Sequence, residues 1–188
     1  VTGARGGVGA TTIAAALAWH LANETQRHCM ALDADLQRGT LALLLGAEAG
    51  SGLRPAIETP ARVDDLFLDR AAHVCSERLH VLAAEEPLGQ ELPAAAGAAA
   101  RLLAVMRRRY NFVVADTPCW PGGLARDLFE MAQQRVLVME PSLAGLRDAL
   151  RLMQLPAGPG QAHRPLLVLN RANRPGGLPT ARVTEVLK

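Results

Sequence analysis

The first twelve residues carry the clearest chemical signal, because V-T-G-A-R-G-G-V-G-A-T-T joins a strand end, a glycine-rich loop and a helix start. Gly6, Gly7 and Gly9 let the backbone take unusual dihedral angles and approach a ligand closely. Backbone N–H groups in such a loop point at an anion, and the positive end of the following helix adds to them. Thr11 would offer a hydroxyl to Mg²⁺. The segment predicts a phosphate-binding loop, and a glycine-rich turn without function is the alternative.

Three loop patterns compete for this segment. The dinucleotide fingerprint G-x-G-x-x-G, counted from Gly7, requires Gly or Ala where Thr12 stands, and the general P-loop pattern departs at two positions. The deviant P-loop pattern x-K-G-G-x-G-K-[ST] fits better, because its three glycines and Thr11 match and Arg5 stands at its first lysine. Ala10 replaces its second lysine.

Two aspartates follow the second apolar run, in L-D-A-D-L-Q-R-G-T. An acidic residue at the carboxyl end of a parallel strand faces the ligand crevice, where it can hold Mg²⁺ or orient a water molecule. We therefore predict functional roles for Asp33 and Asp35. The alternative is that one of them caps the helix predicted near Thr40 or lies in a solvated turn.

Asp116 ends a third apolar run, F-V-V-A-D, and Thr117 and Pro118 follow it. This order is typical of a Walker B element, whose carboxylate reaches the shell of Mg²⁺. Trp120 is interpreted as a packing residue of the same loop.

Asn170 and Arg171 end the last apolar run. A side-chain amide at this position can hydrogen-bond an adenine edge, and a turn-forming asparagine is the alternative.

Short apolar runs alternate with amphipathic segments along the chain, which predicts the elements that must position these residues. Strands are expected at residues 1–3, 28–33, 79–83, 112–116, 136–139 and 166–170, and helices at 11–24, 40–45, 95–108, 123–131, 143–155 and 179–187. Most strands lack polar alternation, as strands buried on both faces of a parallel sheet do. The pattern predicts an α/β fold, a mainly parallel sheet flanked by helices on both faces.

Composition excludes several other classes of protein. The 188 residues are 49% hydrophobic and 3% aromatic with a net charge of +2, which excludes a disordered chain and argues against an aromatic platform for nucleic acid. The dense basic run, Arg107 to Arg109, is interpreted as a helix C-terminus. The three scattered cysteines favour buried reduced thiols over zinc or a disulfide framework. No apolar run approaches the roughly 20 residues of a membrane span.

Three segments together, A-R-G-G-V-G-A-T-T, L-D-A-D-L-Q-R-G-T and Y-N-F-V-V-A-D-T-P, resemble the MinD/ParA family of deviant-Walker P-loop ATPases. Further segments are similar to its CpaE/TadZ branch, which belongs to the tight-adherence (Tad, or Flp) pilus machinery: P-A-R-V-D-D-L-F-L-D-R, E-R-L-H-V-L-A-A-E-E-P, E-P-S-L-A-G-L-R-D-A and V-L-N-R. The resemblance covers essentially the whole chain. It implies a single ATPase-like domain over residues 1–188, and we expect this domain to be truncated at both ends, without a receiver domain and without the C-terminal strands.

The resemblance also implies an ATP-sandwich dimer with ATP or ADP and Mg²⁺ as cofactors. Arg5 corresponds to the signature lysine that reaches the partner's nucleotide, and Asp35 to the switch residue near the attacking water. Metal contacts are expected from Thr11, Asp33 and Asp116. Nucleotide contacts are expected from the loop and from the end of the last strand: Gly6, Gly7, Val8, Gly9, Ala10, Thr11, Thr12, Asn170 and Arg171.

Ala10 stands where the family has the lysine that binds the β- and γ-phosphates, so a charge-assisted contact to the reacting phosphate is lost. We expect nucleotide binding with slow or absent hydrolysis, in a dimeric scaffold or switch that recruits pilus assembly components. We expect a cytoplasmic protein recruited to a cell pole or to the inner membrane face, with membrane contact only through partners.

Three alternatives stay open. An active ParA/MinD-type ATPase that positions cargo over DNA needs a basic surface, for which the charge gives no strong signal. A dinucleotide-dependent oxidoreductase conflicts with Thr12 and with the Asp116 element. A degenerate scaffold that binds no nucleotide is the third alternative, which the loss of the lysine at Ala10 makes a serious one.

Overall fold

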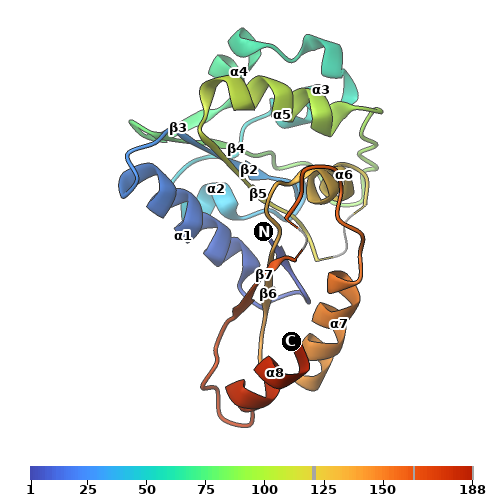
Figure 1. Ribbon diagram of the computed structural model, residues 1–188. Helices are drawn as coiled ribbons and strands as arrows, with labels where there is room; N and C mark the ends of the chain where they lie inside the picture. The colour runs from blue at the N-terminus through green and yellow to red at the C-terminus, as the bar shows by residue number, and fades with distance from the viewer. Residues whose placement is uncertain (120–121, 163, 188) are drawn as a thin grey trace.

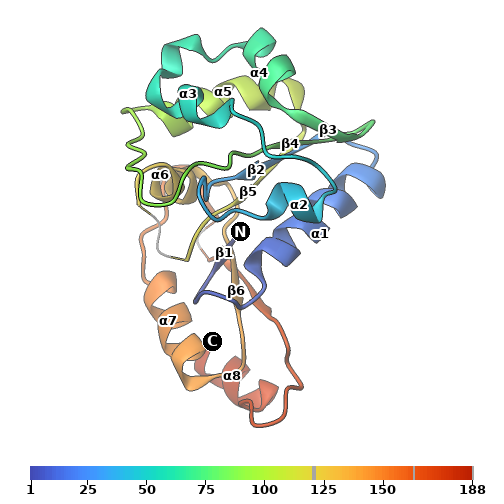
Figure 2. The same ribbon diagram turned by 180° about the vertical axis from the view of Figure 1, so that it is seen from behind.

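The computed structural model describes residues 1–119, 122–162 and 164–187 as an α/β fold with helices on both faces of a twisted sheet (Figures 1 and 2). The strands are β1 (Thr2–Gly3), β2 (Cys29–Asp33), β3 (His73–Ser76), β4 (Leu79–Leu82), β5 (Phe112–Asp116), β6 (Val136–Met139) and β7 (Leu166–Leu169). The helices are α1 (Ala10–Asn23), α2 (Leu41–Leu44), α3 (Leu53–Glu58), the 3₁₀ helix η1 (Pro60–Arg62), α4 (Asp65–Ala71), α5 (Ala98–Arg109), α6 (Leu124–Met131), α7 (Leu143–Met153) and α8 (Thr180–Leu187). The predicted fold class is confirmed.

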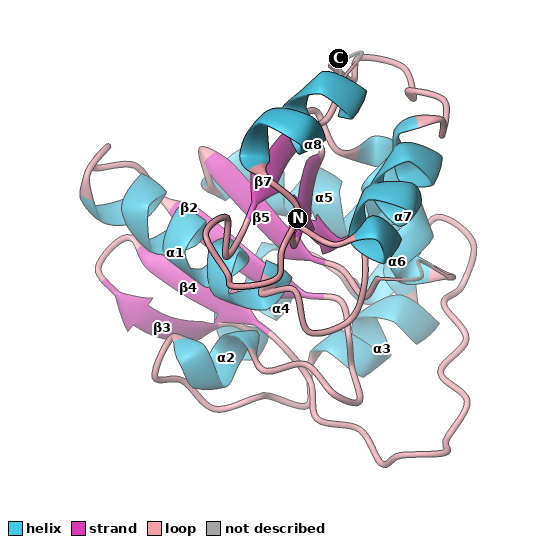
Figure 3. Ribbon diagram, turned by 90° about the horizontal axis from the view of Figure 1, so that it is seen from below, coloured by secondary structure: helices cyan, strands magenta, loops and turns pink. Residues whose placement is uncertain are grey.

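The strands follow the order β3-β4-β2-β5 in one group and β1-β6-β7 in the other. A parallel bridge between Thr2 and Thr117 joins the two groups, so β1 lies between β5 and β6. All pairings are parallel except β3 with β4. Figure 3 shows β3, β4, β2 and β5 in this order, with β7 beyond them. The carboxyl ends of β1, β2, β5 and β7 therefore lie along one edge of the sheet.

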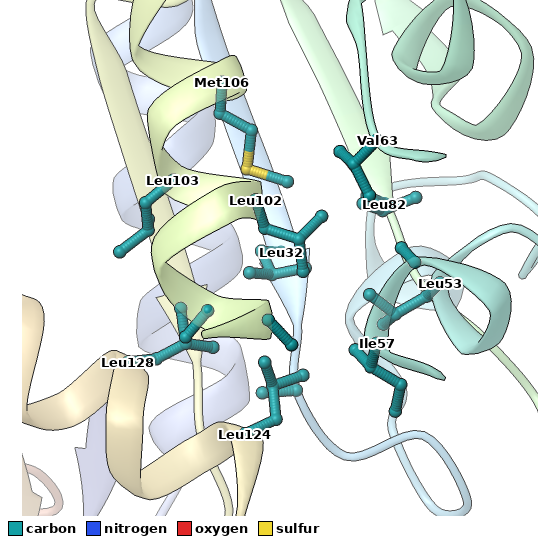
Figure 4. Close-up of a cluster of buried hydrophobic side chains, with 14 of the residues drawn as sticks. Leu32, Leu53, Ile57, Val63, Leu82, Leu102, Leu103, Met106, Leu124 and Leu128 are labelled. Carbon is teal, nitrogen blue, oxygen red and sulfur yellow. The ribbon is translucent and has the colours of Figure 1, made fainter. Parts of the chain in front are cut away.

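Strand β2 is buried along its whole length and supplies side chains to both layers of the core. Met30 and Leu32 face the larger cluster with α3, α5 and α6, part of which is drawn in Figure 4. Cys29 and Ala31 face the other cluster, with α1 and α2. This alternation explains why the strand has an almost continuous apolar sequence. A smaller cluster holds α7 and α8 against β6 and β7.

Two features differ from the sequence-based expectations, and one expectation falls on a residue that is not described. The segment from α3 to β3 forms two helices, a 3₁₀ turn and an antiparallel strand where no element was predicted. Only Cys29 is a fully buried thiol, whereas Cys75 and Cys119 are half-buried, so the expectation of three buried cysteines is wrong for two of them. The packing role predicted for Trp120 falls outside the described residues.

The basic run at the end of α5 is paired within the fold. Arg108 lies 3.0 Å from Asp65 and Arg109 lies 2.5 Å from Asp69, both on α4. Arg107, Arg108 and Arg109 form the last turn of α5, so the interpretation of the run as a helix C-terminus is confirmed. Within the described part of the chain, no helix has the length and apolar character needed to cross a membrane.

Candidate functional site

The loop between β1 and α1 has the backbone shape of an anion cradle. Gly7 and Gly9 take φ values of 78° and 91°, in the left-handed region that side chains disfavour. A Cβ on Gly3 would lie 2.6 Å from the carbonyl oxygen of Arg5, so the start of the loop also requires glycine. Gly6 shows neither constraint, because its φ is not positive and nothing lies within 4 Å of an added Cβ.

Helix α1 begins at this loop and presents its positive end to it. Gly9 is its N-cap, no side chain caps the helix, and no acidic residue lies in its first turn. The N–H groups of the first turn are consequently available to an anion, and the helix dipole favours negative charge there. Ala10 opens the helix and Thr12 is exposed. An alanine at the first helical position adds no positive charge to the site.

Thr11 and Asp116 meet beside the loop. Asp116 ends β5, is 6% exposed and accepts a hydrogen bond from the Thr11 side chain. Burial raises the pKa of Asp116, the hydrogen bond from Thr11 lowers it, and the negative charge of Asp35 raises it again. A hydroxyl and a carboxylate are oxygen ligands of the kind Mg²⁺ takes, so this pair fits that ion.

Asp33 lies at the end of β2 and is 1% exposed. Its two carboxylate oxygens accept hydrogen bonds from the backbone N–H groups of Asp35 at 3.1 Å and Leu41 at 3.0 Å. Burial raises its pKa to about 6 in spite of these two bonds, and the charges of Asp116 and Asp35 contribute to the same direction. The structure thus gives Asp33 a definite role in holding the loop that joins β2 to α2. Its role as a metal ligand stays a prediction.

Asp35 shapes the first turn of that same loop. One carboxylate oxygen accepts from the backbone N–H groups of Gln37 at 3.4 Å and Arg38 at 3.0 Å. Its charge acts on both Asp33 and Asp116, so the three carboxylates share one region beside the phosphate loop. Among residues 1–119, 122–162 and 164–187, no group of three or more His, Cys, Asp or Glu side chains is arranged to hold a metal ion. A cation here would need phosphate or water oxygens besides Thr11 and Asp116.

Arg5 forms an ion pair with Asp148 on helix α7 of the same chain. Its Nη1 lies 2.6 Å from Oδ2 of Asp148, whose side chain is 9% exposed against 48% for Arg5. The arginine predicted to reach a partner's nucleotide is therefore held by an intramolecular ion pair. Sequence reasoning missed Asp148. The available signal was an acidic residue in the helix that follows β6, at the same edge of the sheet.

Asn170 and Arg171 directly follow β7, and Asn170 contacts the glycine-rich loop. The Asn170 side chain donates a hydrogen bond to the carbonyl oxygen of Val8, at 2.8 Å. Arg171 has a φ of 55°, and its guanidinium lies 3.6 Å from the carboxylate of Glu140, a second acidic residue that sequence reasoning missed. The structure thus brings Asn170 to the predicted phosphate loop across most of the chain length.

Comparison with known proteins identifies this fold. No family model matches the chain, and no curated protein does either. A ParA family ATPase from Chlorobium tepidum TLS superposes with a TM-score of 0.86 at 23% identity, over 99% of this chain and 77% of that one. The septum site-determining protein MinD of Pyrococcus horikoshii OT3, complexed with Mg-ADP, gives 0.77 at 22% identity, over 98% and 75%. MinD in the MinC:MinD complex of Aquifex aeolicus gives 0.75 at 19% identity, over 99% and 76%.

These likenesses define the class of fold. The chain has the parallel, helix-flanked α/β fold of ParA- and MinD-type P-loop ATPases. Identities at this level establish the fold and leave the activity to be argued from the site.

Proposed function

We propose that this chain is a nucleotide-binding protein of the MinD/ParA type that takes ATP or ADP with Mg²⁺. The observation that carries the proposal is the glycine-bounded loop at the N-terminus of α1, with Thr11 and Asp116 hydrogen-bonded beside it. The likeness to a MinD complexed with Mg-ADP supports the same ligand class.

The chain's own groups have distinct tasks in this proposal. Backbone N–H groups of residues 5–12 bind the phosphates. Thr11 and Asp116 would hold Mg²⁺, which when bound offsets phosphate charge. Asp35 would orient a water molecule. Asn170 and Arg171 would lie against the base.

Hydrolysis is expected to be slow or absent because Ala10 carries no charge. A lysine there would donate charge-assisted hydrogen bonds to the phosphate and stabilise the charge that develops as the bond breaks. Arg5 keeps one positive charge near the loop, but its partner is Asp148. The site is therefore better suited to binding a nucleotide than to turning it over.

We further propose a dimeric scaffold or switch of the CpaE/TadZ branch, working in Tad pilus assembly in the cytoplasm, at a cell pole or the inner membrane face. The sequence resemblance supports the branch, and the Aquifex aeolicus MinD found in complex with MinC supports partner binding for proteins of this fold. In a sandwich dimer, Arg5 would have to exchange Asp148 for the partner's nucleotide. Pull-down of pilus assembly components with the chain as bait tests this assignment.

Calorimetric titration of Mg-ATP into the protein tests nucleotide binding. We expect a dissociation constant in the micromolar range, and a weaker one for Thr11→Val, which keeps the side-chain shape and removes the hydroxyl. Absence of binding at millimolar Mg-ATP contradicts the proposal and leaves the degenerate scaffold. A turnover rate equal to that of active family members would contradict the expectation of slow hydrolysis.

A further inference from the structure

Asn170 is fixed in the structure by three hydrogen bonds. Its backbone N–H donates to the carbonyl oxygen of Met139 at 2.8 Å, which continues the pairing of β7 with β6. Its side-chain Nδ2 donates to the carbonyl oxygen of Val8 at 2.8 Å, and Oδ1 accepts from the backbone N–H of Arg171 at 2.9 Å. The side-chain amide is therefore oriented at both of its ends, with one end on the phosphate loop.

The contact with the loop is close as well as polar. A Cβ on Gly9 would lie 2.5 Å from Nδ2 of Asn170, and the φ of Gly9 is 91°. The Val8 side chain is 2% exposed. Two contacts therefore hold the last turn of the loop: the side chain of Val8 is buried in the fold, and the amide of Asn170 lies against Gly9.

This contact has a direct consequence for the phosphate-binding groups. The carbonyl of Val8 and the N–H of Gly9 belong to one planar trans peptide, so they point in opposite directions. Because Asn170 holds the Val8 carbonyl, it also directs the Gly9 N–H away from itself. Gly9 caps α1, so this N–H lies at the end of the helix where an anion is favoured.

The segment after β7, which begins with Asn170, is itself anchored to the rest of the fold. The carboxylate of Glu140 lies 3.6 Å from Arg171 and 3.4 Å from Arg174, and the carbonyl oxygen of Pro141 accepts from the backbone N–H of Leu178 at 2.7 Å. These contacts tie the segment after β7 to the segment after β6. Because its segment is anchored in this way, Asn170 can fix the shape of the phosphate loop in the absence of ligand.

We propose that Asn170 is a positioning residue of the phosphate loop, which sets the orientation of the Val8–Gly9 peptide in addition to the base contact predicted from sequence. The proposal rests on the proposed nucleotide binding for its functional meaning. It makes Asn170 matter for the phosphates of any nucleotide, whatever the base.

Mg-tripolyphosphate separates the two roles, because it carries phosphates and no base. Asn170→Ala should weaken binding of Mg-tripolyphosphate by about threefold to tenfold, for one lost hydrogen bond, and binding of Mg-ATP by at least the same factor. Asn23→Ala is the matched control, since it also removes an asparagine amide that donates to a backbone carbonyl, that of Trp19 at 2.9 Å, at the end of α1 far from the loop. Loss of Mg-ATP affinity with unchanged Mg-tripolyphosphate affinity overturns the proposal and assigns Asn170 to base contact alone.

Amide hydrogen exchange of the nucleotide-free protein gives a second readout that needs no ligand. Asn170→Ala should speed exchange at the N–H of Ile13, which donates to the carbonyl oxygen of Gly9 at 3.0 Å, by about threefold to tenfold, with the core strands unchanged. Asn23→Ala should leave this rate as in the wild type. If the wild type binds neither ligand, the proposed function fails, and the exchange rates still decide this inference. Equal rates in wild type and Asn170→Ala contradict it.

Discussion

Asp33 offers the sharpest test of the electrostatics at the carboxyl end of the sheet. The side chain is 1% exposed, and burial raises the pKa of its carboxyl from 3.8 to about 6. Replacing Asp33 by Asn removes the titration and keeps the size of the side chain. The comparison of the two proteins at different pH values therefore isolates the free energy of this one group.

The expected size follows from linkage between protonation and folding. Because the pKa is higher in the folded state, the folded protein binds the proton first as pH falls from about 6 toward 4. The wild type thus gains stability as pH falls through this window, and loses it as pH rises to 6. One pKa unit corresponds to about 1.4 kcal/mol, so the full effect is about 3 kcal/mol. About 2 kcal/mol of it should appear between pH 6.5 and pH 4.5.

Urea denaturation of both proteins at pH 6.5 and 4.5 measures this effect. Asn at this position presents only one oxygen to the two backbone N–H groups, and that cost is present at both pH values and cancels in the difference. We expect the wild type to gain about 2 kcal/mol relative to Asp33→Asn at the lower pH. Glu48→Gln, at an exposed position, controls for the loss of one negative charge. If the stability of the wild type relative to Asp33→Asn stays constant or falls as pH is lowered, the reasoning is refuted.

Three further predictions concern the loop and its partners. Ala10→Lys should tighten Mg-ATP binding by about tenfold or more and raise turnover; calorimetry and phosphate release check this, and unchanged values contradict it. Asp148→Ala should cost no more than about 1 kcal/mol of stability, because Arg5, the partner that it leaves, is half exposed and can be solvated. The variant should also raise the dimer fraction with Mg-ATP in sedimentation, and an unchanged fraction contradicts this. Gly9→Ala should abolish Mg-ATP binding in calorimetry, since its Cβ would meet Asn170. The Cβ of Gly7→Ala meets nothing within 4 Å, so this variant should retain part of the Mg-ATP affinity. Equal losses of affinity in the two variants contradict the role of the contact with Asn170.

Several elements could be predicted from local sequence for a physical reason. The bounds of β5 and β6 match the prediction, because strands inside a parallel sheet are apolar on both faces and end at polar residues. Helix α5 begins at Ala98 rather than at 95, because Gly97 takes a φ of 80° and ends the preceding loop. Local pattern located these elements within a few residues.

The segment from α3 to β3 could not be predicted in the same way. Helices α3 and α4 have only 6 and 7 residues, too few to display a helical period. Strand β3 has two exposed and two half-buried residues, so its sequence lacks the apolar signal of the other strands. Its antiparallel pairing depends on a neighbouring strand rather than on its own residues.

The sequence by itself determined the parts of the site that lie within one segment. The glycines of the loop, Thr11 at the start of α1, and Asp116 at the end of β5 follow from local motifs, because backbone conformation and strand ends are local properties. The sequence likewise shows that Ala10 lacks the positive charge of the lysine that the P-loop pattern has at this position.

Tertiary structure alone decided which partners meet these residues. Asp148 lies 143 residues from Arg5, and Asn170 lies 162 residues from Val8. Both contacts exist because β1 lies between β5 and β6, with β7 next to β6, which gathers the carboxyl ends of distant strands at one edge. Strand order arises from the packing of whole elements against each other, and no local pattern of residues encodes it.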